Sequence, residues 1–272
     1  KGGAGVAAHG LDQTLVAAIL VGLALSFALP FIGFVLLGVM TKLDVKDRAA
    51  VAAHYGSISI VTFVAATSVL EGLGIAAEGY MVAVAAVMEA PAILSALWIV
   101  GRYGGETQTS GTPYRELLLN GSIVLLVGSF LIGVATGEAG LQSIAPFIVS
   151  PFQGVLCLFL LDMGLIAGRG LRDARGDLGL GAVCFGLVMP LVGACAGMLA
   201  GLAIGLSTGG LALLMTLAAS ASYIAVPAAM RVALPEARPS VYLTLSLGVT
   251  FPFNLTLGIP LYAAVAASVM GG

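Results

Sequence analysis

The chain reads Val51-Ala-Ala-His-Tyr-Gly-Ser-Ile-Ser-Ile-Val-Thr-Phe-Val-Ala-Ala-Thr-Ser-Val69 in a stretch that is apolar enough to enter a lipid bilayer, yet a Gly-Ser-Ile-Ser cluster interrupts it. Backbone loosened at that depth is tolerated only against protein or a water-filled cavity, because lipid offers it no hydrogen bond. A second stretch, Leu211-Ala-Leu-Leu-Met-Thr-Leu-Ala-Ala-Ser-Ala-Ser-Tyr-Ile-Ala-Val-Pro-Ala-Ala-Met230, is interrupted by Ser and Pro. Paired interruptions of this kind are typical of a transporter's binding site.

The composition indicates an integral membrane protein. Hydrophobic residues make up 60% of the 272 positions and charged residues 9%, and the mean hydropathy is +1.11. A soluble domain carries roughly 25% charged residues. We predict no enzyme and no cofactor besides a sodium ion, because the sequence has no nucleophile–base set, zinc-binding HExxH motif or phosphate-binding loop. We also predict no nucleic-acid partner, because there is no stripe of basic and aromatic residues.

Eight apolar segments have about the 20 residues that a spanning helix needs. They are 14–41, 51–69, 79–101, 117–137, 144–168, 179–206, 211–230 and 239–269. We therefore predict an all-α polytopic membrane protein with about eight transmembrane helices in this chain, two of them broken at its core.

The basic residues predict the orientation of these spans. Loops that contain Lys or Arg alternate with loops that contain only acidic residues, so nearly all the basic residues fall on one side of the membrane. They are Lys42, Lys46, Arg48, Arg102, Arg115, Arg169, Arg172, Arg175, Arg231 and Arg238. By the positive-inside rule that side is cytoplasmic. We predict a multi-pass protein of the bacterial inner membrane.

The order of the segments predicts an inverted repeat. A broken segment followed by a polar, proline-containing one occurs twice, the latter at Glu89-Ala-Pro91 and at Thr250-Phe-Pro-Phe-Asn254. Because five helices separate the two copies, they run in opposite directions. We predict a first, N-terminally incomplete repeat at 1–101, a cytoplasmic connecting loop at 102–116 and a second repeat at 117–272. The symmetry predicts two further helices before this sequence begins, and hence five per repeat.

The two breaks form the predicted anion site. N–H groups at the start of a half-helix carry partial positive charge and attract anions. Because no Lys or Arg lies in either break, a small monoanion is favoured. The predicted substrate-binding residues are Gly56, Ser57, Ser59, Thr62, Ser220, Ser222 and Tyr223. The alternative for each hydroxyl is a hydrogen bond within its own helix or to a neighbouring helix.

Glu89 is the carboxylate that lies deepest in a predicted span. An intramembrane acid is a functional hypothesis by default. Glu89 binds a coupling cation, carries a proton or accepts hydrogen bonds from the neighbouring break. The structural alternative is a bond to a backbone group freed by Pro91. We predict Thr250 and Asn254 as its partners in the coupling site, with helix packing as the alternative for Asn254.

Three motifs resemble the sodium-dependent bicarbonate transporter family of the SbtA type. They are Gly56-Ser-Ile-Ser-Ile-Val-Thr62 followed by Leu70-Glu71, Met88-Glu-Ala-Pro-Ala92, and Ala218-Ala-Ser-Ala-Ser-Tyr-Ile-Ala-Val-Pro227 continuing to Pro239-Ser-Val-Tyr242. The similarity spans essentially the whole chain. It implies a secondary transporter with core and gate regions, an elevator-like motion and a homotrimer, in which bicarbonate is bound between the breaks with sodium beside it.

The resemblance also indicates which residues keep the family pattern. The matched site-lining hydroxyls are those of Ser59, Thr62, Ser220 and Ser222, and Glu89 keeps an acid where the type members have Asp. Tyr223 stands where they have Asp, and Ala225 and Val61 replace Ser, which argues for a weaker sodium site or a changed substrate. The family's long cytoplasmic loop between the repeats is nearly absent, which argues against the PII-like regulatory partner known for the type members.

The sequence therefore predicts a secondary active transporter that imports a small monoanion, above all bicarbonate, coupled to sodium by alternating access. One alternative is a proton- or sodium-coupled carrier of another small anion, such as a short carboxylate. An alternative of another class is a non-transporting membrane receptor or regulatory subunit, which an appended signalling domain would indicate.

Overall fold

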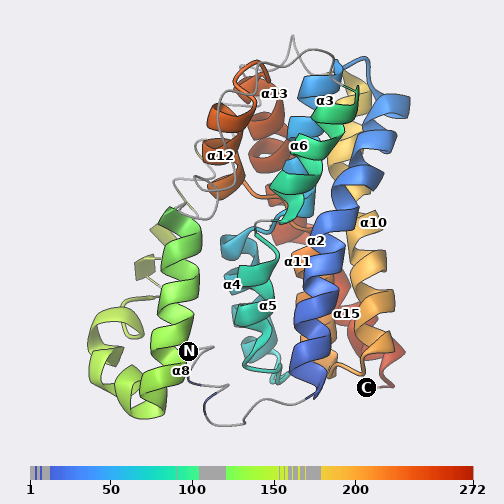
Figure 1. The fold of residues 1–272 in the computed structure, drawn as a ribbon. Coiled ribbons are helices and arrows are strands. Elements are labelled where there is room, and N and C mark those ends of the chain that lie inside the picture. The colour runs from blue at the N-terminus through green and yellow to red at the C-terminus, as the bar shows by residue number, and fades with distance from the viewer. Residues whose placement is uncertain are drawn as a thin grey trace.

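The computed structural model describes residues 13–89, 91–103, 121–152 and 179–271, together with a few separate residues between 4 and 169. The ordered elements of these ranges are all helices (Figure 1). The predicted connecting loop 102–116 lies outside the described residues from position 104 onward, and so does most of the predicted span 144–168 beyond residue 152.

In the order of helices along the chain, each of the two predicted breaks falls between the end of one helix and the start of the next. They are α2 (Gln13–Met40), α3 (Val45–Gly56), α4 (Ile60–Gly72), α5 (Met81–Val87), α6 (Pro91–Tyr103), α8 (Gly121–Ile148), α10 (Leu180–Ala203), α11 (Thr208–Ala219), α12 (Ala225–Ala233), α13 (Pro239–Leu243), η2 (Thr244–Thr250), α14 (Phe251–Phe253), η3 (Asn254–Gly258) and α15 (Ile259–Val269).

Six helical stretches of the described residues are long and apolar enough to cross a membrane. They are Gln13–Met40, Val45–Gly72, Met81–Tyr103, Leu131–Ile148, Leu180–Ala203 and Pro239–Val269. This confirms the predicted all-α polytopic class. The predicted span 211–230 is divided into α11 and α12, which are each too short to cross alone. The predicted helix end at residue 137 coincides with a sharp bend in α8, where Gly137 has a φ of 60°.

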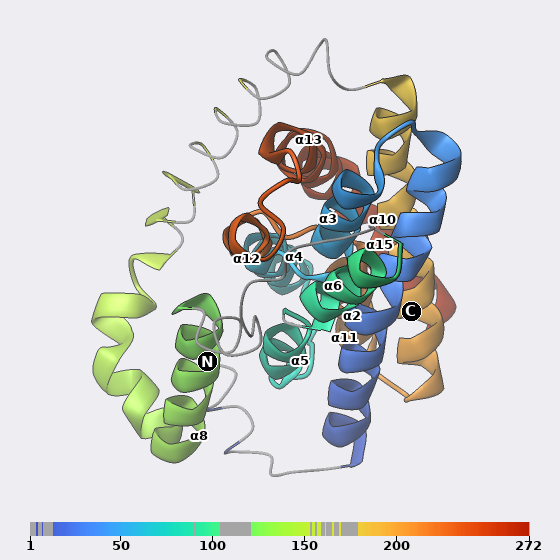
Figure 2. The ribbon, with the colours of Figure 1, turned by 45° about the horizontal axis from the view of Figure 1, so that its top comes forward.

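The two broken helices lie in the middle of the bundle. α2 and α6 pack against α3, and α10 and α15 pack against α11, while α12 contacts both α3 and α6 (Figures 1 and 2). Burial follows this arrangement, because 83% of an apolar stretch of 18 residues in the α3–α4 span is buried and none of Leu131–Ile148 in α8 is. α8 lies to one side, where it contacts α5 (Figure 1). Because the broken helices lie inside the bundle, neighbouring protein groups can form the hydrogen bonds that the backbone loses at each break.

Small residues allow α10 to approach the second broken helix. A Cβ placed on Gly193 would collide with the carbonyl oxygen of Ala218, and one on Gly197 would lie 2.8 Å from the carbonyl oxygen of Leu214. Both carbonyls belong to the α11 backbone, which cannot move aside as a flexible side chain could. Glycines therefore set the distance between α10 and α11, as is common where helices pack in membranes.

The last span departs from regular α-helix at the predicted polar cluster. Residues Thr244–Thr250 and Asn254–Gly258 form π-helical turns on either side of the short α14. Pro252 and Pro260 follow them, and proline has no N–H for the helical ladder. π-Turns admit an extra residue per turn and are frequent at functional sites. They change which side chains face the neighbouring helices.

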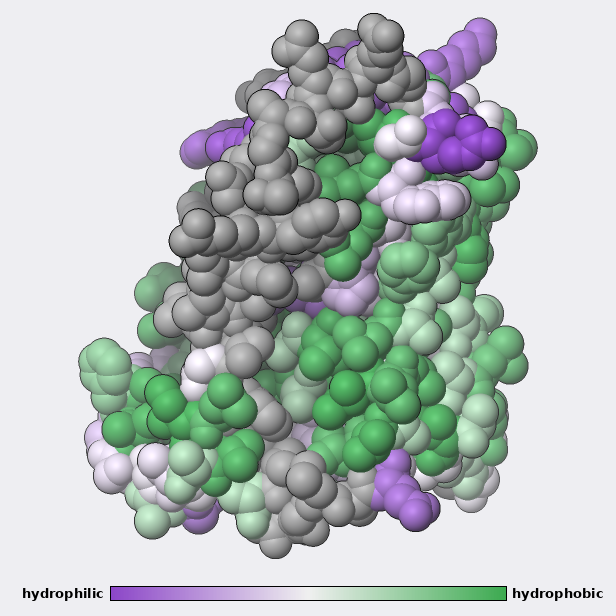
Figure 3. Space-filling view, in the orientation of Figure 1, coloured by the Kyte–Doolittle hydropathy of each residue, from purple (hydrophilic) through white to green (hydrophobic). Residues whose placement is uncertain are grey.

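Ion pairs gather where α3 begins. Arg238 donates to Asp47 from its backbone N–H (2.8 Å to Oδ1) and from its guanidinium (2.6 Å from Nη2 to Oδ2), and Lys46 pairs with Glu236 at 3.0 Å. Figure 3 shows hydrophilic side chains at this end of the molecule and a broad hydrophobic surface below it. Lys46 and Arg238 thus share one end, as the predicted topology requires, and the cytoplasmic assignment of that end stays a prediction.

Candidate functional site

The first break lies between α3 and α4. Ser57 and Ser59 have extended backbone, with ψ angles of 165° and 108°. Ser59 caps α4, because its Oγ accepts hydrogen bonds from the Thr62 backbone N–H (3.2 Å) and the Thr62 hydroxyl (2.9 Å). Ser is a favoured N-cap for this reason. The predicted substrate residue Thr62 therefore supports the cap of the half-helix.

The second break lies between α11 and α12. Ser220 is extended, with a ψ of 160°, and its hydroxyl donates to the Leu217 carbonyl at 2.8 Å. α12 begins at Ala225, and the Val226 N–H lies 3.4 Å from the hydroxyl of Ser222. In both breaks one half-helix ends and the next begins within a few residues, so a C-terminal and an N-terminal helix end face the interior of the bundle.

Hydrogen bonds join the two breaks to each other. The Ser59 N–H donates to the Ser220 hydroxyl at 3.0 Å, and the Ser222 N–H donates to the His54 carbonyl at 2.8 Å. Groups freed by one interruption are thus satisfied by the other, which buried backbone requires. The structure brings the two predicted serine clusters together although 161 positions separate Ser59 from Ser220.

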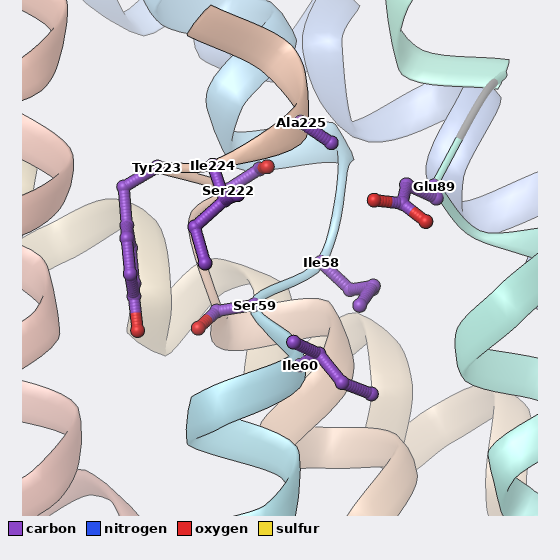
Figure 4. A pocket seen from close by; sticks show the side chains of 8 residues that line it. All are labelled: Ile58, Ser59, Ile60, Glu89, Ser222, Tyr223, Ile224 and Ala225. Atoms are coloured by element: carbon purple, nitrogen blue, oxygen red, sulfur yellow. The ribbon is translucent and has the colours of Figure 1, made fainter. Parts of the chain in front are cut away.

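A cavity of about 210 Å³ lies where the breaks meet. It is lined by Ile58, Ser59, Ile60, Glu89, Ser222, Tyr223, Ile224 and Ala225 (Figure 4). Residues from the start of α4 and the start of α12 form two of its walls, and the first amides of a helix have no partner within that helix. The cavity therefore combines two helix N-termini, three hydroxyl groups and one carboxyl group, with no basic side chain among the described lining residues.

Glu89 enters this cavity from a third interruption, between α5 and α6. The Ser26 hydroxyl donates to the Met88 carbonyl at 2.6 Å, and the Ser57 hydroxyl donates to the Glu89 carbonyl at 3.0 Å. The predicted residue Ser57 thus holds the backbone of Glu89. The carboxyl group points across the cavity from the side opposite Ser222 (Figure 4), and its Oε2 is buried without a hydrogen-bond partner.

Tyr223 lies on the opposite wall from Glu89 (Figure 4). Its ring packs edge-on against Phe251, with centroids 5.0 Å apart, and its buried hydroxyl lies on the side of Ser59 without a hydrogen-bond partner among the described residues (Figure 4). The polar tip therefore belongs to the cavity and the ring to the apolar contact beside it.

The predicted coupling residues Thr250 and Asn254 do not line this cavity. The Thr250 hydroxyl donates to the Gly186 carbonyl at 2.6 Å and lies 2.6 Å from the Tyr55 hydroxyl. Asn254 donates from Nδ2 to the Ala219 carbonyl at 2.9 Å, and its Oδ1 accepts from Tyr262 at 2.9 Å. Asn254 thus contacts the C-terminal end of α11, behind the break, and the structure does not bring it to Glu89.

Close packing explains why a glycine stands at position 56, at the end of α3. A Cβ there would collide with the ring of Pro30 and lie 2.9 Å from the Cβ of Ala92. The interpretation from sequence missed the apolar lining residues Ile58, Ile60 and Ile224. Their position beside the serines was the available signal. Among the described residues, no group of three or more His, Cys, Asp or Glu could hold a metal ion.

Two broken helices that meet at buried breaks, with the N-termini of α4 and α12 at one polar cavity, are the arrangement typical of secondary transporters. The family model of the Na+-dependent bicarbonate transporter superfamily matches residues 1–267. The chain belongs to this superfamily, and its general role is Na+-dependent bicarbonate transport. No curated protein matches the chain.

Proposed function

We propose that this protein imports bicarbonate together with sodium and binds the anion in the cavity between the two breaks. The observation that carries the proposal is the convergence of the N-termini of α4 and α12 on a cavity with the hydroxyls of Ser59 and Ser222. Each helix N-terminus carries roughly half a positive charge. Two such ends match one negative charge, and the absence of basic side chains from the described lining disfavours a multiply charged anion.

Sodium is the second substrate of this proposal. In broken-helix transporters, cations are coordinated by unwound carbonyls and by the C-terminal ends of half-helices. The end of α11 provides such carbonyls, and Asn254 is bonded to one of them, that of Ala219, while Thr250 is bonded to Gly186 in α10. We assign sodium to the side of the breaks where α11 ends, and the anion to the side where α4 and α12 begin. Glu89 is the group that couples anion binding to the movement of the helices.

We further propose alternating access by an elevator-like motion, a homotrimer and a location in the bacterial inner membrane. The domain division at 1–101, 102–116 and 117–272 with inverted symmetry belongs to the same proposal. The crossing of two similarly broken helices supports it, because inverted repeats produce such a pair. Without the long cytoplasmic loop, a PII-like partner is not part of the proposed mechanism.

The test uses the full-length protein in liposomes, with labelled bicarbonate uptake measured with and without an inward sodium gradient at fixed pH. Ser59→Leu and Ser222→Leu are expected to abolish sodium-dependent uptake, because the larger side chain fills the cavity. Ser143→Leu is the matched control, since Ser143 is exposed on α8 and bonds only within its helix. Uptake at the wild-type rate by both cavity variants would exclude this site.

A short monocarboxylate is a second candidate substrate. Ile58, Ile60 and Ile224 give the cavity an apolar lining that bicarbonate does not need but that an alkyl group would contact. Competition of unlabelled acetate or propionate with labelled bicarbonate separates the two candidates, because only a shared site gives mutual inhibition.

A further inference from the structure

The carboxyl group of Glu89 is the polar group of the cavity whose state the bicarbonate proposal leaves open. Glu89 is 5% exposed, and its Oε2 has no hydrogen-bond partner. A buried polar atom without a partner is uncommon in a folded protein. This one points into a cavity that we assign to an anion (Figure 4).

An ionised Glu89 would place a second negative charge beside the bound anion. A carboxylate accepts hydrogen bonds and donates none, whereas a protonated carboxyl group donates one. Bicarbonate has three oxygen acceptors and one O–H donor, so a protonated Glu89 can donate to it without adding charge to the cavity. The ionised form could accept a hydrogen bond from the bicarbonate O–H, but it would hold two negative charges together with no basic side chain among the described lining residues, so the protonated form is the better complement to the anion.

The charged neighbours of Glu89 do not compensate a carboxylate. The described parts of α2, α5 and α11 contain no acidic or basic residue. The acidic and strongly basic residues in the described parts of α3, α4, α6, α8 and α12 are Lys46, Asp47, Arg48, Glu71, Arg102, Glu138 and Arg231. They are not among the described lining residues of the cavity, where Tyr223 is the other titratable group.

His54, in the last turn of α3, is the histidine that lies beside the first break. Its Nδ1 lies 2.6 Å from the Ala50 carbonyl, and its ring stacks on Tyr242 at 4.5 Å. A ring bonded within its own helix and stacked on α13 does not pair with Glu89.

The chemistry of bicarbonate excludes this proton as the driving ion. Carrying one proton with one bicarbonate delivers the equivalent of carbon dioxide and water, and carbon dioxide crosses lipid unaided. Such a cycle cannot raise inorganic carbon above the level that carbon dioxide diffusion reaches by itself, so sodium has to supply the driving force and the proton has to stay on the protein.

We infer that Glu89 works in its protonated form, as a hydrogen-bond donor to the transported anion, and that uptake falls as this carboxyl group ionises. The inference rests on the proposed function, since it assigns a role within the same anion site. The donor role sets the direction of the pH dependence. Uptake is highest at pH values where Glu89 is protonated and is lost as the pH rises through the range in which Glu89 ionises.

The first measurement is an infrared titration of the purified full-length protein from about pH 6 to about pH 9, where exposed carboxyl groups are already ionised. We expect the C=O stretching band of a protonated carboxyl group, absent from Glu89→Gln and shifted when bicarbonate is added. A missing band, or a band that bicarbonate leaves unchanged, would overturn the inference. This measurement decides the question even if transport of bicarbonate fails.

The second measurement is uptake over the same pH range, at a fixed bicarbonate concentration and a fixed sodium gradient. Wild type and Glu89→Asp should lose uptake toward high pH, whereas Glu89→Gln, whose amide is a permanent neutral donor, should retain a reduced uptake without the alkaline fall. A Glu89→Gln protein that is folded but inactive would show that the carboxylate charge is required and would refute the donor role. Wild type inactive at every pH would instead refute the proposed function.

Discussion

Substituting Gly56 by alanine tests whether the first break is fixed by packing. The added Cβ would lie 2.9 Å from the Cβ of Ala92 on α6 and closer still to the ring of Pro30 on α2. Non-bonded carbons pack at about 3.5–4.0 Å. The end of α3 must therefore move by at least about 0.6 Å away from Ala92, and the rigid proline ring blocks the other direction.

Overpacking of this kind costs about 1–3 kcal/mol. The cost should lower the thermal unfolding midpoint in detergent. Because Gly56 directly precedes Ser57 and Ser59, the displacement should also move the serines that set the cavity. A misplacement of about 1 Å can cost about 10²-fold in rate, so sodium-dependent uptake should fall by more than the loss of folded protein explains.

The matched control is Gly101→Ala, which changes the same residue type in α6 where a Cβ meets nothing within 4 Å. Alanine in an open helical position is favoured over glycine by about 0.5–1 kcal/mol, so this variant should be as stable as wild type or more so. The reasoning is refuted if Gly56→Ala matches Gly101→Ala in both unfolding midpoint and uptake.

Other substitutions test the supports around the cavity. Gly193→Ala should lower the unfolding midpoint by pushing α10 off the α11 backbone, at about 1–3 kcal/mol, measured by thermal unfolding. Ser26→Ala leaves the carbonyl of Met88 unpaired and should cost about 1–3 kcal/mol in stability. It should also lower uptake by more than the loss of folded protein explains. Asp47→Ala removes an acceptor that is 1% exposed and should destabilise by about 1–3 kcal/mol, whereas Lys46→Ala, in an exposed pair, should cost less than about 1 kcal/mol. Equal midpoints for these last two variants would contradict the assignment.

The breaks could be predicted from sequence because their signal is local. Gly, Ser and Pro inside an apolar run compete with the helical ladder wherever they occur, and Ser59 does so as an N-cap. The contact between the breaks could not be predicted in detail. The bond from the Ser59 N–H to Ser220 joins residues 161 positions apart and depends on how α3 and α11 cross.

Thr250 and Asn254 show a different limit of the sequence pattern. Both are polar residues at mid-depth, which made them predicted partners of Glu89. The π-turns on either side of α14 admit extra residues, so a count of 3.6 residues per turn misplaces their faces. In the structure their hydrogen bonds go to Gly186 and Ala219, and only Glu89 reaches the cavity.

Charge balance connects these observations to transport. Two half-helix N-termini supply about one positive charge in total, which one monoanion neutralises while Glu89 is protonated. If Glu89 ionises, one negative charge is left over in a cavity whose described lining has no basic side chain to pair with it. Fixed dipoles and hydroxyls also hold an anion less firmly than a buried arginine would, and a carrier has to release its substrate on the other side of the membrane. The absence of basic side chains from the described cavity wall is therefore what a reversible site for one small anion requires.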